Sequence, residues 1–580
     1  MTSRSVDKDV VLDKKSIIAI VILAVLIIFY WPILQKLGFV TPEEEPVPAQ
    51  AGDTAVVTPS QTEPIATPEP AAPAETSQPS AQLAEPQTDT VKVDTLIVQT
   101  NKYQVALISL GGGVTSLMLK DYTYRDGAPV ELFPNGRRAT PEAVFAGGTF
   151  STSTLPFTCN LAPDEYDATR EPLEVIYTYA PPSGGRIERH FVFHPDDHSF
   201  DLKLIIDQPA QMQLEREYRL GWSTPLEPTE PNLQDDWSSM QAAAMMAGSR
   251  VSLDDFDDGV LRQTVDGQVA WVGVRSKYFA KVLIPRSRPA EGAYADGGER
   301  DVVAPDGGMV EERRITAGLK LPFAAVSSVV DSFTVFVGPL DYMMMSDYDV
   351  DLEDMLDIGT TPYIGWIIKP FAIAIMWIMP ILYDVVPNYG LVIILFALIV
   401  KIITLPLSMR SFKSMQAMKD LQPKVEDLKQ RLKKDPQKLN QEMMKLYKAH
   451  GVNPLSGCLP ILPQMPLFFA LFSVFRSTIL LRNAPFVWFI DDLSRGAQSL
   501  TDPYIILVVL MVAAQFLSQK LTMASTQQNK MFIYLMPFLM GFIFYRFAAG
   551  LVLYWTSFSV LAMLDYVLFR KPKNPQVKSA

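Results

Sequence analysis

One charged side chain stands inside a strongly apolar stretch of the chain. Lys401 lies between Leu398 and Leu405, where every other residue except Thr404 is apolar. A lysine at this depth in hydrocarbon costs roughly 2.5–3.5 kcal/mol, and snorkelling of its ammonium to the membrane surface is the structural alternative. The nearest acid, Asp565, is expected close to the inner end of the last apolar segment. We therefore predict that Lys401 is an unpaired cation in a water-filled cavity.

Other polar side chains in the apolar segments could line this cavity. They are Gln464, Ser473, Arg476, Gln515, Thr556, Ser557 and Ser559. Pro460, Pro463 and Pro466 would leave backbone carbonyls without donors, which a wet groove tolerates and hydrocarbon does not. Methionine is plentiful around the same segments and suits surfaces that accept many apolar partners. Ordinary core packing would explain any single methionine.

The sequence gives little support for catalytic or metal chemistry. His190, His194 and His198 recur every four residues, but Pro195 would break a strand before the third, so a structural or surface role is favoured over a metal site. Cys159 and Cys458 are too few for a disulfide scaffold or a Cys-rich zinc module. The outer domain proposed below contains no nucleophile–base pair, phosphate loop or acidic pair. We predict no enzyme activity, no metal and no cofactor.

The composition indicates a membrane protein built from very different parts. The chain has 580 residues, 45 prolines and 20% charged residues, yet its mean hydropathy is +0.13. A uniform globular chain would not combine these values. The net charge of −12 argues against a nucleic-acid binder.

The first ninety residues are predicted to anchor and tether the protein. Ile17–Leu34 is long enough to span a bilayer, and Lys14 and Lys15 before it place the N-terminus in the cytoplasm. A cleaved signal peptide is the less favoured alternative, because the Ala-Gln-Ala triplet at 49–51 lies far beyond the apolar run. We assign 1–40 to the cytoplasmic tip and anchor. Residues 41–90, with ten prolines within Thr41–Thr90, form a disordered linker.

A β-rich outer domain is predicted over residues 91–346. Short alternating apolar and polar stretches are typical of strands and are separated by glycine-rich turns at 111–113, 181–185 and 306–308. The clearest are Thr95–Val98, Tyr103–Leu107, His190–Phe193 and Thr334–Val337. This pattern predicts an all-β sandwich, which the topology places on the outer face of the membrane.

The C-terminal half contains several apolar segments long enough to be spans. They are Tyr363–Val386, Tyr389–Leu407, Leu459–Leu481, Pro503–Leu521 and Met531–Phe569, the last with room for two crossings and a turn near 546–550. The loop 408–450 carries eleven Lys or Arg and five acids, so it belongs in the cytoplasm. This requires 363–386 to lie along the outer interface as an amphipathic helix. Six spans with both termini cytoplasmic follow.

These topological assignments divide the rest of the chain into three parts. Residues 347–388 form a connector and the interfacial helix. Residues 389–570 form a five-span core that includes the cytoplasmic hairpin 408–450. Residues 571–580 form a cytoplasmic tail.

The cytoplasmic loop has the pattern of an antiparallel helical hairpin. The first helix carries a heptad seam, Met418, Leu421, Val425, Leu428 and Leu432, and the return seam is Leu439, Met443 and Leu446. Lys433 and Lys434 would close the first helix, Asp435 would cap the second with Pro436 in its first turn, and Gly451 would end it. Pro423 must either kink or restart the first helix. A docking element is favoured over a plain solvated loop.

Several motifs resemble those of the YidC/Oxa/Alb-type membrane protein insertases. They are Leu421-Gln422-Pro423-Lys424, Leu446-Tyr447-Lys448, the run Asn453 to Pro460, Gln464-Met465-Pro466, Ala484-Pro485-Phe486 and the run Gly550 to Trp555. The resemblance covers about 358–570. The outer domain, with Gly111-Gly112-Gly113 and Trp271-Val272-Gly273, is more weakly similar to the large periplasmic domain of the Gram-negative members.

This resemblance implies a five-helix core with a hydrophilic groove open to the cytoplasm and to lipid. Lys401 falls where the family carries its groove cation, usually Arg, and Tyr554 and Trp555 fall on aromatic positions of the substrate path. The implied activity is insertion and folding of nascent proteins of the bacterial inner membrane, alone or beside the Sec translocon. The implied partners are nascent membrane proteins, the Sec translocon and membrane lipid, with ribosome–nascent-chain complexes as a further candidate, and no nucleic acid of its own.

The chain departs from the family pattern in the last span and in the tail. Arg546 to Gly550 replaces a common Phe-Pro-Ser/Ala-Gly turn, Ser559 replaces a usual Asn, and Asp565-Tyr566 stands where Gln-Gln is common. The short C-terminal tail gives no support for ribosome docking through a long basic extension.

A secondary transporter or channel is the alternative function, and it predicts paired intramembrane charges and internal repeats. A structural scaffold ranks third, since it leaves Lys401 unexplained.

Overall fold

The computed structural model describes ten stretches of the chain, which all belong to one compact unit, Gln87–Ala580. They are residues 93–133, 138–145, 150–214, 217–304, 307–323, 327–358, 364–433, 435–452, 461–522 and 527–569. The predicted anchor, linker and tail, and the motif 453–460, lie outside the described residues.

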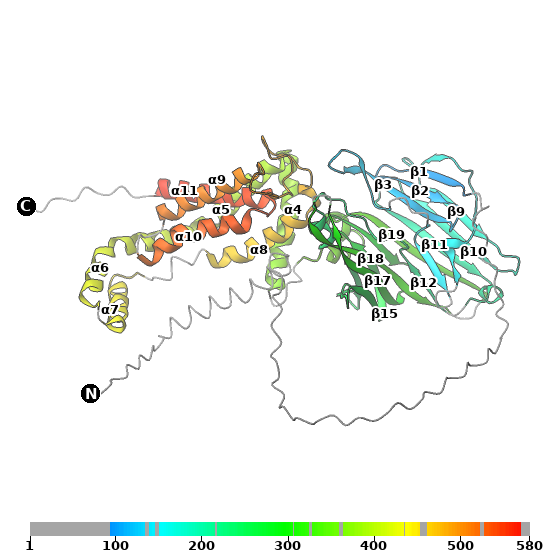
Figure 1. Cartoon of the computed structure of the whole chain (residues 1–580), viewed down its shortest axis with the longest axis horizontal. Coiled ribbons are helices and arrows are strands. Elements are labelled where there is room, and N and C mark those ends of the chain that lie inside the picture. The colour runs from blue at the N-terminus through cyan, green and yellow to red at the C-terminus, as the bar shows by residue number, and fades with distance from the viewer. Residues whose placement is uncertain are drawn as a thin grey trace, which may run out of the picture. The chain divides into compact units, whose positions relative to one another are not determined.

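The first half of the described chain forms two β-sheets (Figure 1). The five-stranded sheet has the order β4(Pro129–Glu131), β3(Gly113–Thr123), β2(Tyr103–Ile108), β1(Thr95–Gln99) and β8(Glu165–Asp167). The main path of the 14-stranded sheet is β6(Phe150–Ser151), β5(Glu142–Phe145), β12(Glu217–Gly221), β18(Met309–Pro322), β17(Ala290–Val303), β15(Val260–Arg275), β16(Phe279–Pro285), β19(Ser328–Pro339), β11(Ser199–Asp207), β10(Arg186–Phe193), β9(Leu173–Tyr179) and β7(Thr158–Cys159). β13(Gln241–Met246) and β14(Ser249–Ser252) join it beside β15. The prediction of an all-β sandwich is confirmed.

Alternation of side chains explains why these segments are strands. In β10 the buried positions are Ile187, Arg189, Phe191 and Phe193, every second residue, as the period of a strand requires. Apolar residues of both sheets share one core. Arg189 occupies a core position because its guanidinium donates hydrogen bonds to the carbonyl oxygens of Gly111, at 2.8 Å, and Pro141. A charged residue therefore continues the apolar pattern of the strand.

The three histidines do not converge on a metal site. His190 contacts Glu174 and Glu188, His194 contacts Asp201, and His198 is buried between β10 and β11. Among the described residues no group of three or more His, Cys, Asp or Glu side chains could hold a metal ion. His190 and His194 thus pair with carboxylates, and His198 lies in the protein interior.

Burial of His198 makes the stability of the β-sandwich depend on pH. Burial, aided by Lys102, lowers the pKa of His198 from 6.5 to about 4. The unfolded chain therefore takes up this proton at a higher pH than the folded protein, and the free energy of unfolding falls as pH drops from 6.5 toward 4, by up to about 3 kcal/mol. We expect His198→Leu to flatten this slope in thermal unfolding of the full-length protein in detergent.

The control for this measurement is His194→Gln, which removes a histidine from the same loop. In this variant the free energy of unfolding should still fall between pH 6.5 and pH 4, as in the unmodified protein, because His198 is retained. An unchanged slope in His198→Leu would contradict the prediction.

The second half of the described chain is helical (Figure 1). Short elements come first: α2(Leu233–Trp237) lies within the β part, and α3(Tyr342–Ser346) and η4(Leu352–Leu356) follow β19. The longer helices are α4(Gly365–Val385), α5(Tyr389–Asp420), α6(Gln422–Arg431), α7(Pro436–Ala449), α8(Ile461–Ser477), α9(Ile505–Thr522), α10(Gln527–Phe544) and α11(Ala549–Phe569), with the 3-10 turn η6(Ile479–Leu481) after α8. The predicted segment 531–569 therefore contains two helices with a turn between them.

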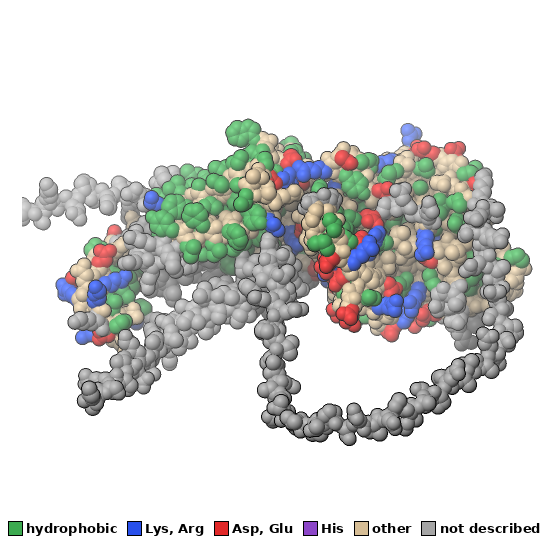
Figure 2. All heavy atoms as spheres, viewed as in Figure 1, with side chains coloured by type: hydrophobic (Ala, Val, Ile, Leu, Met, Phe, Trp, Pro, Cys, Tyr) green, Lys and Arg blue, Asp and Glu red, His purple; other side chains and the backbone are tan. Residues whose placement is uncertain are grey.

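The helical part has the surface of a membrane domain. By length and composition alone, Gly365–Val385 and Tyr389–Met409 could each cross a membrane. Figure 2 shows mainly apolar side chains on the visible face of the helical bundle, whereas charged side chains are spread over the β-sheets and over the hairpin of α6 and α7. The exposed apolar residues include Ile402, Ile403, Leu510, Leu517, Phe538, Phe542, Val560 and Leu564. Side chains of this kind on several helices suit contact with lipid.

The loop before α9 packs closely on the turn between α10 and α11. The amide of Ala497 donates to the carbonyl of Tyr545 at 2.9 Å, and the amide of Ala549 donates to that of Arg495 at 2.7 Å. At Gly496 a Cβ atom would overlap the carbonyl oxygen of Arg546 and lie 2.7 Å from that of Phe547. Only glycine fits here without moving the backbone.

We expect Gly496→Ala to destabilise the helical part by about 1–3 kcal/mol, since the added methyl must push two backbone segments apart. Thermal unfolding of the full-length protein in detergent measures this loss. The control is Gly298→Ala in β17, where the nearest atom to an added Cβ is 3.5 Å away. Equal effects of the two substitutions would contradict the close packing at Gly496.

Candidate functional site

Lys401 is buried in α5 and paired with an acid from α11. Its ammonium nitrogen lies 2.9 Å from Oδ2 of Asp565, and the two side chains are 8% and 21% exposed. The Phe558 ring, also on α11, has its centroid 4.8 Å from the same nitrogen. The prediction of an unpaired ammonium is therefore wrong. Asp565, near the C-terminal end of α11, reaches the lysine because the two side chains come from neighbouring helices.

One face of α11 carries the groups that meet α5. Tyr554, Phe558 and Asp565 follow at intervals of four and seven residues, which places them along one side of a helix. The Tyr554 ring packs between Phe558 and Phe396 of α5, with centroid distances of 6.0 and 6.2 Å. Tyr554 is buried, and its hydroxyl has no hydrogen-bond partner among the described residues. This face carries aromatic rings toward the start of α11 and a charge toward its C-terminal end.

A second face of α11 meets α8, α9 and α10 through Trp555. Its indole nitrogen donates to Oε1 of Gln515 on α9 at 3.2 Å. The indole ring contacts Phe468 of α8 and Phe544 of α10, with centroids 5.4 and 5.7 Å away. Gln515 is buried, so this hydrogen bond satisfies a polar group inside the bundle. The predicted aromatic position thus joins four helices of the core.

The remaining predicted cavity residues are not all brought together. Gln464 and Ser473 are half-buried on α8, and Ser559 is buried on α11. The hydroxyls of Thr556 and Ser557 donate to carbonyls of their own helix, at 2.7 and 2.8 Å. These two hydroxyls are therefore satisfied within α11.

Arg476 was also predicted to line the cavity, and this prediction is wrong. Its guanidinium lies 3.3 Å from Oδ1 of Asp235, which belongs to α2 in the β part. Arg476 is in the last turn of α8, and Arg482, a few residues further on, similarly lies 2.6 Å from Glu230. Position near a helix end lets a basic side chain leave the apolar segment and find an acid outside it.

The contacts of Asp565 and Phe558 with Lys401 were not predicted. The spacing does place Asp565 on the same face as Tyr554, because eleven residues are about three helical turns. It does not show which helix this face meets, and the lysine and aspartate side chains can bridge a difference in depth between two helices.

The hairpin predicted over 408–450 has helices in both halves, but its first half differs from the prediction. α5 runs without a break past Pro406 to Asp420, so Met418 belongs to α5. A new helix, α6, starts at Gln422 with Pro423 in its first turn, so the proline restarts the helix. Leu421 and Val425 are buried, and Met418, Leu428, Leu432 and Leu446 are half-buried. Of the two alternatives left open at Pro423, a kink or a restart, the structure has the restart, and the apolar positions of the seam turn inward.

The return helix of the hairpin is confirmed at both ends. Asp435 accepts a hydrogen bond from the amide of Lys438 at 3.0 Å and is the N-cap of α7, with Pro436 in the first turn. Gly451 has a φ of +65° and follows the last turn. The amide of Val452 donates to the carbonyl of Tyr447, a pattern that closes helices at glycine. Lys434 lies outside the described residues, and the last turn of α6 carries Lys429 and Arg431.

α4 has one packed face and one exposed face. Ile368, Ala372 and Met379 are buried, whereas Trp366 is 77% exposed and Trp377 is also exposed. The ammonium of Lys369 lies 2.7 Å from Asp354 of η4. Exposed tryptophans and a charged pair near the helix start suit the membrane surface, but α4 is also long and apolar enough to span.

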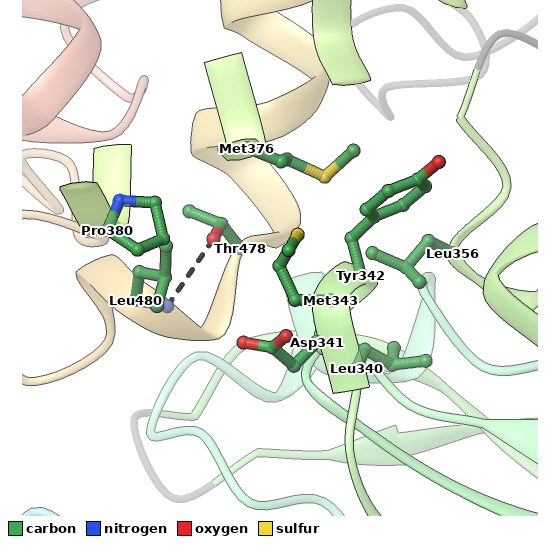
Figure 3. A pocket seen from close by; sticks show the side chains of 9 residues that line it. All are labelled: Leu340, Asp341, Tyr342, Met343, Leu356, Met376, Pro380, Thr478 and Leu480. Atoms are coloured by element: carbon green, nitrogen blue, oxygen red, sulfur yellow. Dashed lines mark hydrogen bonds between the residues drawn. The ribbon is translucent and has the colours of Figure 1, made fainter. Parts of the chain in front are cut away.

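A shallow pocket lies beside α4, where the connector meets the end of α8 (Figure 3). Its lining is mainly apolar, and Thr478 accepts a hydrogen bond from the amide of Leu480 at 3.4 Å. The lining residues are Leu340, Asp341, Tyr342, Met343, Leu356, Met376, Pro380, Thr478 and Leu480. None of them belongs to the predicted site.

Two protein-family models match this chain, one over the β part and one over most of the helical part. The family described as "YidC periplasmic domain" matches residues 95–374, and the family described as "60Kd inner membrane protein" matches residues 381–576. The membrane protein insertase YidC of Pelodictyon phaeoclathratiforme is 32% identical, over 97% of this chain and 95% of the relative. The chain belongs to the YidC family of membrane protein insertases. Membership of this family places the protein in the inner membrane.

Other YidC proteins match to a similar extent. The insertase of Chlorobium luteolum is 32% identical over 95% of this chain and 94% of the relative. The solved structure of an active YidC insertase with its first transmembrane domain resolved covers 82% of this chain and 92% of its own, with 18% identity and a TM-score of 0.35. The resemblance inferred from the motifs is confirmed by the sequence relatives.

The charge pair bears on the transporter alternative. Paired intramembrane charges were the feature that a secondary transporter predicts, and Lys401 and Asp565 are such a pair. Membership of the YidC family nevertheless decides for a membrane protein insertase. The role of the Lys401–Asp565 pair is therefore to be sought in membrane protein insertion.

Proposed function

We propose that this YidC protein inserts nascent membrane proteins through a hydrophilic groove open to the cytoplasm, in which Lys401 is the cation that attracts the client. The observation that carries the proposal is the burial of Lys401 in the apolar helix α5. A lysine is costly there, and attraction of an acidic client flank gives it a use. The client's apolar segment then moves along the helices into lipid, and no nucleotide is required.

We propose that the client path follows the polar and aromatic residues of α8, α9 and α11. They are Gln464, Ser473, Gln515, Tyr554, Trp555 and Ser559. The hydrogen bond between Trp555 and Gln515 supports this assignment, because it keeps a polar group and an aromatic surface together inside the bundle. Tyr554 has a buried hydroxyl without a described partner, which a client backbone group could satisfy.

The proposed topology is the one predicted from the charges. Six spans place both termini and the hairpin 408–450 in the cytoplasm and residues 91–346 in the periplasm, with 1–40 as anchor, 41–90 as linker, 347–388 as connector and interfacial helix, 389–570 as core and 571–580 as tail. The exposed tryptophans of α4 and its Lys369–Asp354 pair support a position at the outer interface.

We propose that the hairpin receives clients and that the protein works alone or beside the Sec translocon. The residues assigned to this docking role are Met418, Leu421, Leu428, Leu432 and Leu446. Support comes from the basic exposed surface of α6 and α7 and from the half-buried apolar residues between them. Ribosome–nascent-chain complexes are a further proposed partner of this surface.

Reconstitution tests the proposed function directly. The purified full-length protein is placed in liposomes without nucleotide, and insertion of a small single-span client is followed by protease protection. We expect insertion well above that in protein-free liposomes. Equal protection in both preparations would overturn the insertase proposal.

A further inference from the structure

The Lys401–Asp565 pair is held by few contacts. Oδ2 of Asp565, the oxygen 2.9 Å from the ammonium, has no hydrogen-bond partner of acceptable angle among the described residues. On the lysine side, the Phe558 ring lies 4.8 Å from the nitrogen. The carboxylate is therefore held mainly by charge attraction, whereas strong ion pairs also carry well-aligned hydrogen bonds. Such a carboxylate can be exchanged for another that approaches in better geometry.

Asp565 is also placed so that it can leave the pair. Its side chain is 21% exposed, against 8% for Lys401. It lies four residues before the end of α11, so about 6 Å of helix separates it from the last residue of that helix. Oδ2 of Asp565 is buried against the ammonium, whereas the rest of the Asp565 side chain is partly exposed. The acid therefore has a route to water that the buried Lys401 lacks.

We propose that Asp565 is a specificity-determining residue that occupies the Lys401 site at rest and is displaced by an acidic client flank. This inference rests on the proposed function. During the exchange, Lys401 keeps one carboxylate partner at every stage, so neither charge is left alone in the protein interior. Asp565 moves to water as the client acid enters. Clients without an acid cannot complete this exchange and gain nothing from Lys401.

The test compares clients that differ only in the charge of their flank. The full-length protein in liposomes is given a single-span client whose short flank carries either no acid or one Asp, and insertion is measured by protease protection. In Asp565→Asn the internal competitor is lost, so the preference for the acidic over the neutral client should rise by about fivefold or more. The control is Asp384→Asn, which removes an exposed acid near the end of α4 and should leave the preference unchanged.

A charge exchange keeps the test valid if Asp565→Asn folds poorly. The double variant Lys401→Asp with Asp565→Lys retains an ion pair with its signs reversed. It should prefer a client with a basic flank over one with an acidic flank, which a merely structural pair would not produce. An unchanged preference in Asp565→Asn, or an equal loss of both clients, would overturn the proposal.

These outcomes separate this inference from the proposed function. If Lys401→Ala inserts both clients as well as the unmodified protein, the groove cation itself fails. If Lys401 is required but the single and double variants leave client preference unchanged, only the role of Asp565 fails.

Discussion

Replacement of Lys401 by Ala or Glu is expected to lower insertion of a small client with an acidic flank about tenfold or more, because a charge-assisted contact is lost. Lys401→Arg should retain most of the activity, since arginine keeps the charge and can reach the same carboxylates. Protease protection of the client in a strain depleted of its own insertase measures the effect. Unchanged insertion with all three would mean that the Lys401–Asp565 pair has only a structural role.

Two further variants make the Lys401 result specific. Lys401→Ala leaves the partly buried Asp565 without its cation, which lowers the amount of folded protein. The double variant Lys401→Ala with Asp565→Asn removes both charges, and it should remain defective if the client needs the cation. Lys520→Ala provides the matched control, because Lys520 is an exposed lysine in the last turn of α9. It should insert clients normally.

Removal of the Trp271 side chain is expected to cost the β-sandwich about 3–5 kcal/mol. Trp271 is 0% exposed in β15, opposite Met245 of β13. Its indole nitrogen donates to the carbonyl of Val350 at 3.0 Å, so the ring also holds the connector that leads to the helices. Trp271→Ala would leave a large cavity and an unpaired carbonyl. Thermal unfolding of the full-length protein in detergent, together with protease sensitivity near residue 350, measures the loss.

Trp488→Ala is the matched control for this prediction. Trp488 lies in the loop before α9 and is 98% exposed. The same substitution there removes a ring without opening a cavity, so the change in the free energy of unfolding should stay within about 0.5 kcal/mol. If both variants lose the same stability, the packing of Trp271 does not explain its effect.

Local patterns predicted the elements of this protein well. The caps of α7 were visible because Asp435, Pro436 and Gly451 act through contacts with residues two to five positions away. Strand β10 was visible because its apolar residues alternate. The interior position of Arg189 was not visible, since it depends on carbonyls of Gly111 and Pro141, which are distant in sequence.

The candidate site shows the same limit. Burial of Lys401 could be predicted, because the apolar residues around it are its neighbours in sequence. Its pairing could not be read from one helix, because Asp565 lies on another and the distance depends on how α5 and α11 pack. The break at Asp420 also required the structure, since Pro423 was compatible with a kinked helix and with a restarted one.

Because α5 is continuous, one helix connects the region of Lys401 to the hairpin. The helix runs from Tyr389 to Asp420, 32 residues, and is therefore about 48 Å long. Lys401 lies along its length, and α6 begins two residues after its C-terminal end. A tilt of α5 by a few degrees would therefore swing the hairpin through several ångströms. A small movement of α5 near Lys401 thus becomes a larger movement of α6 and α7.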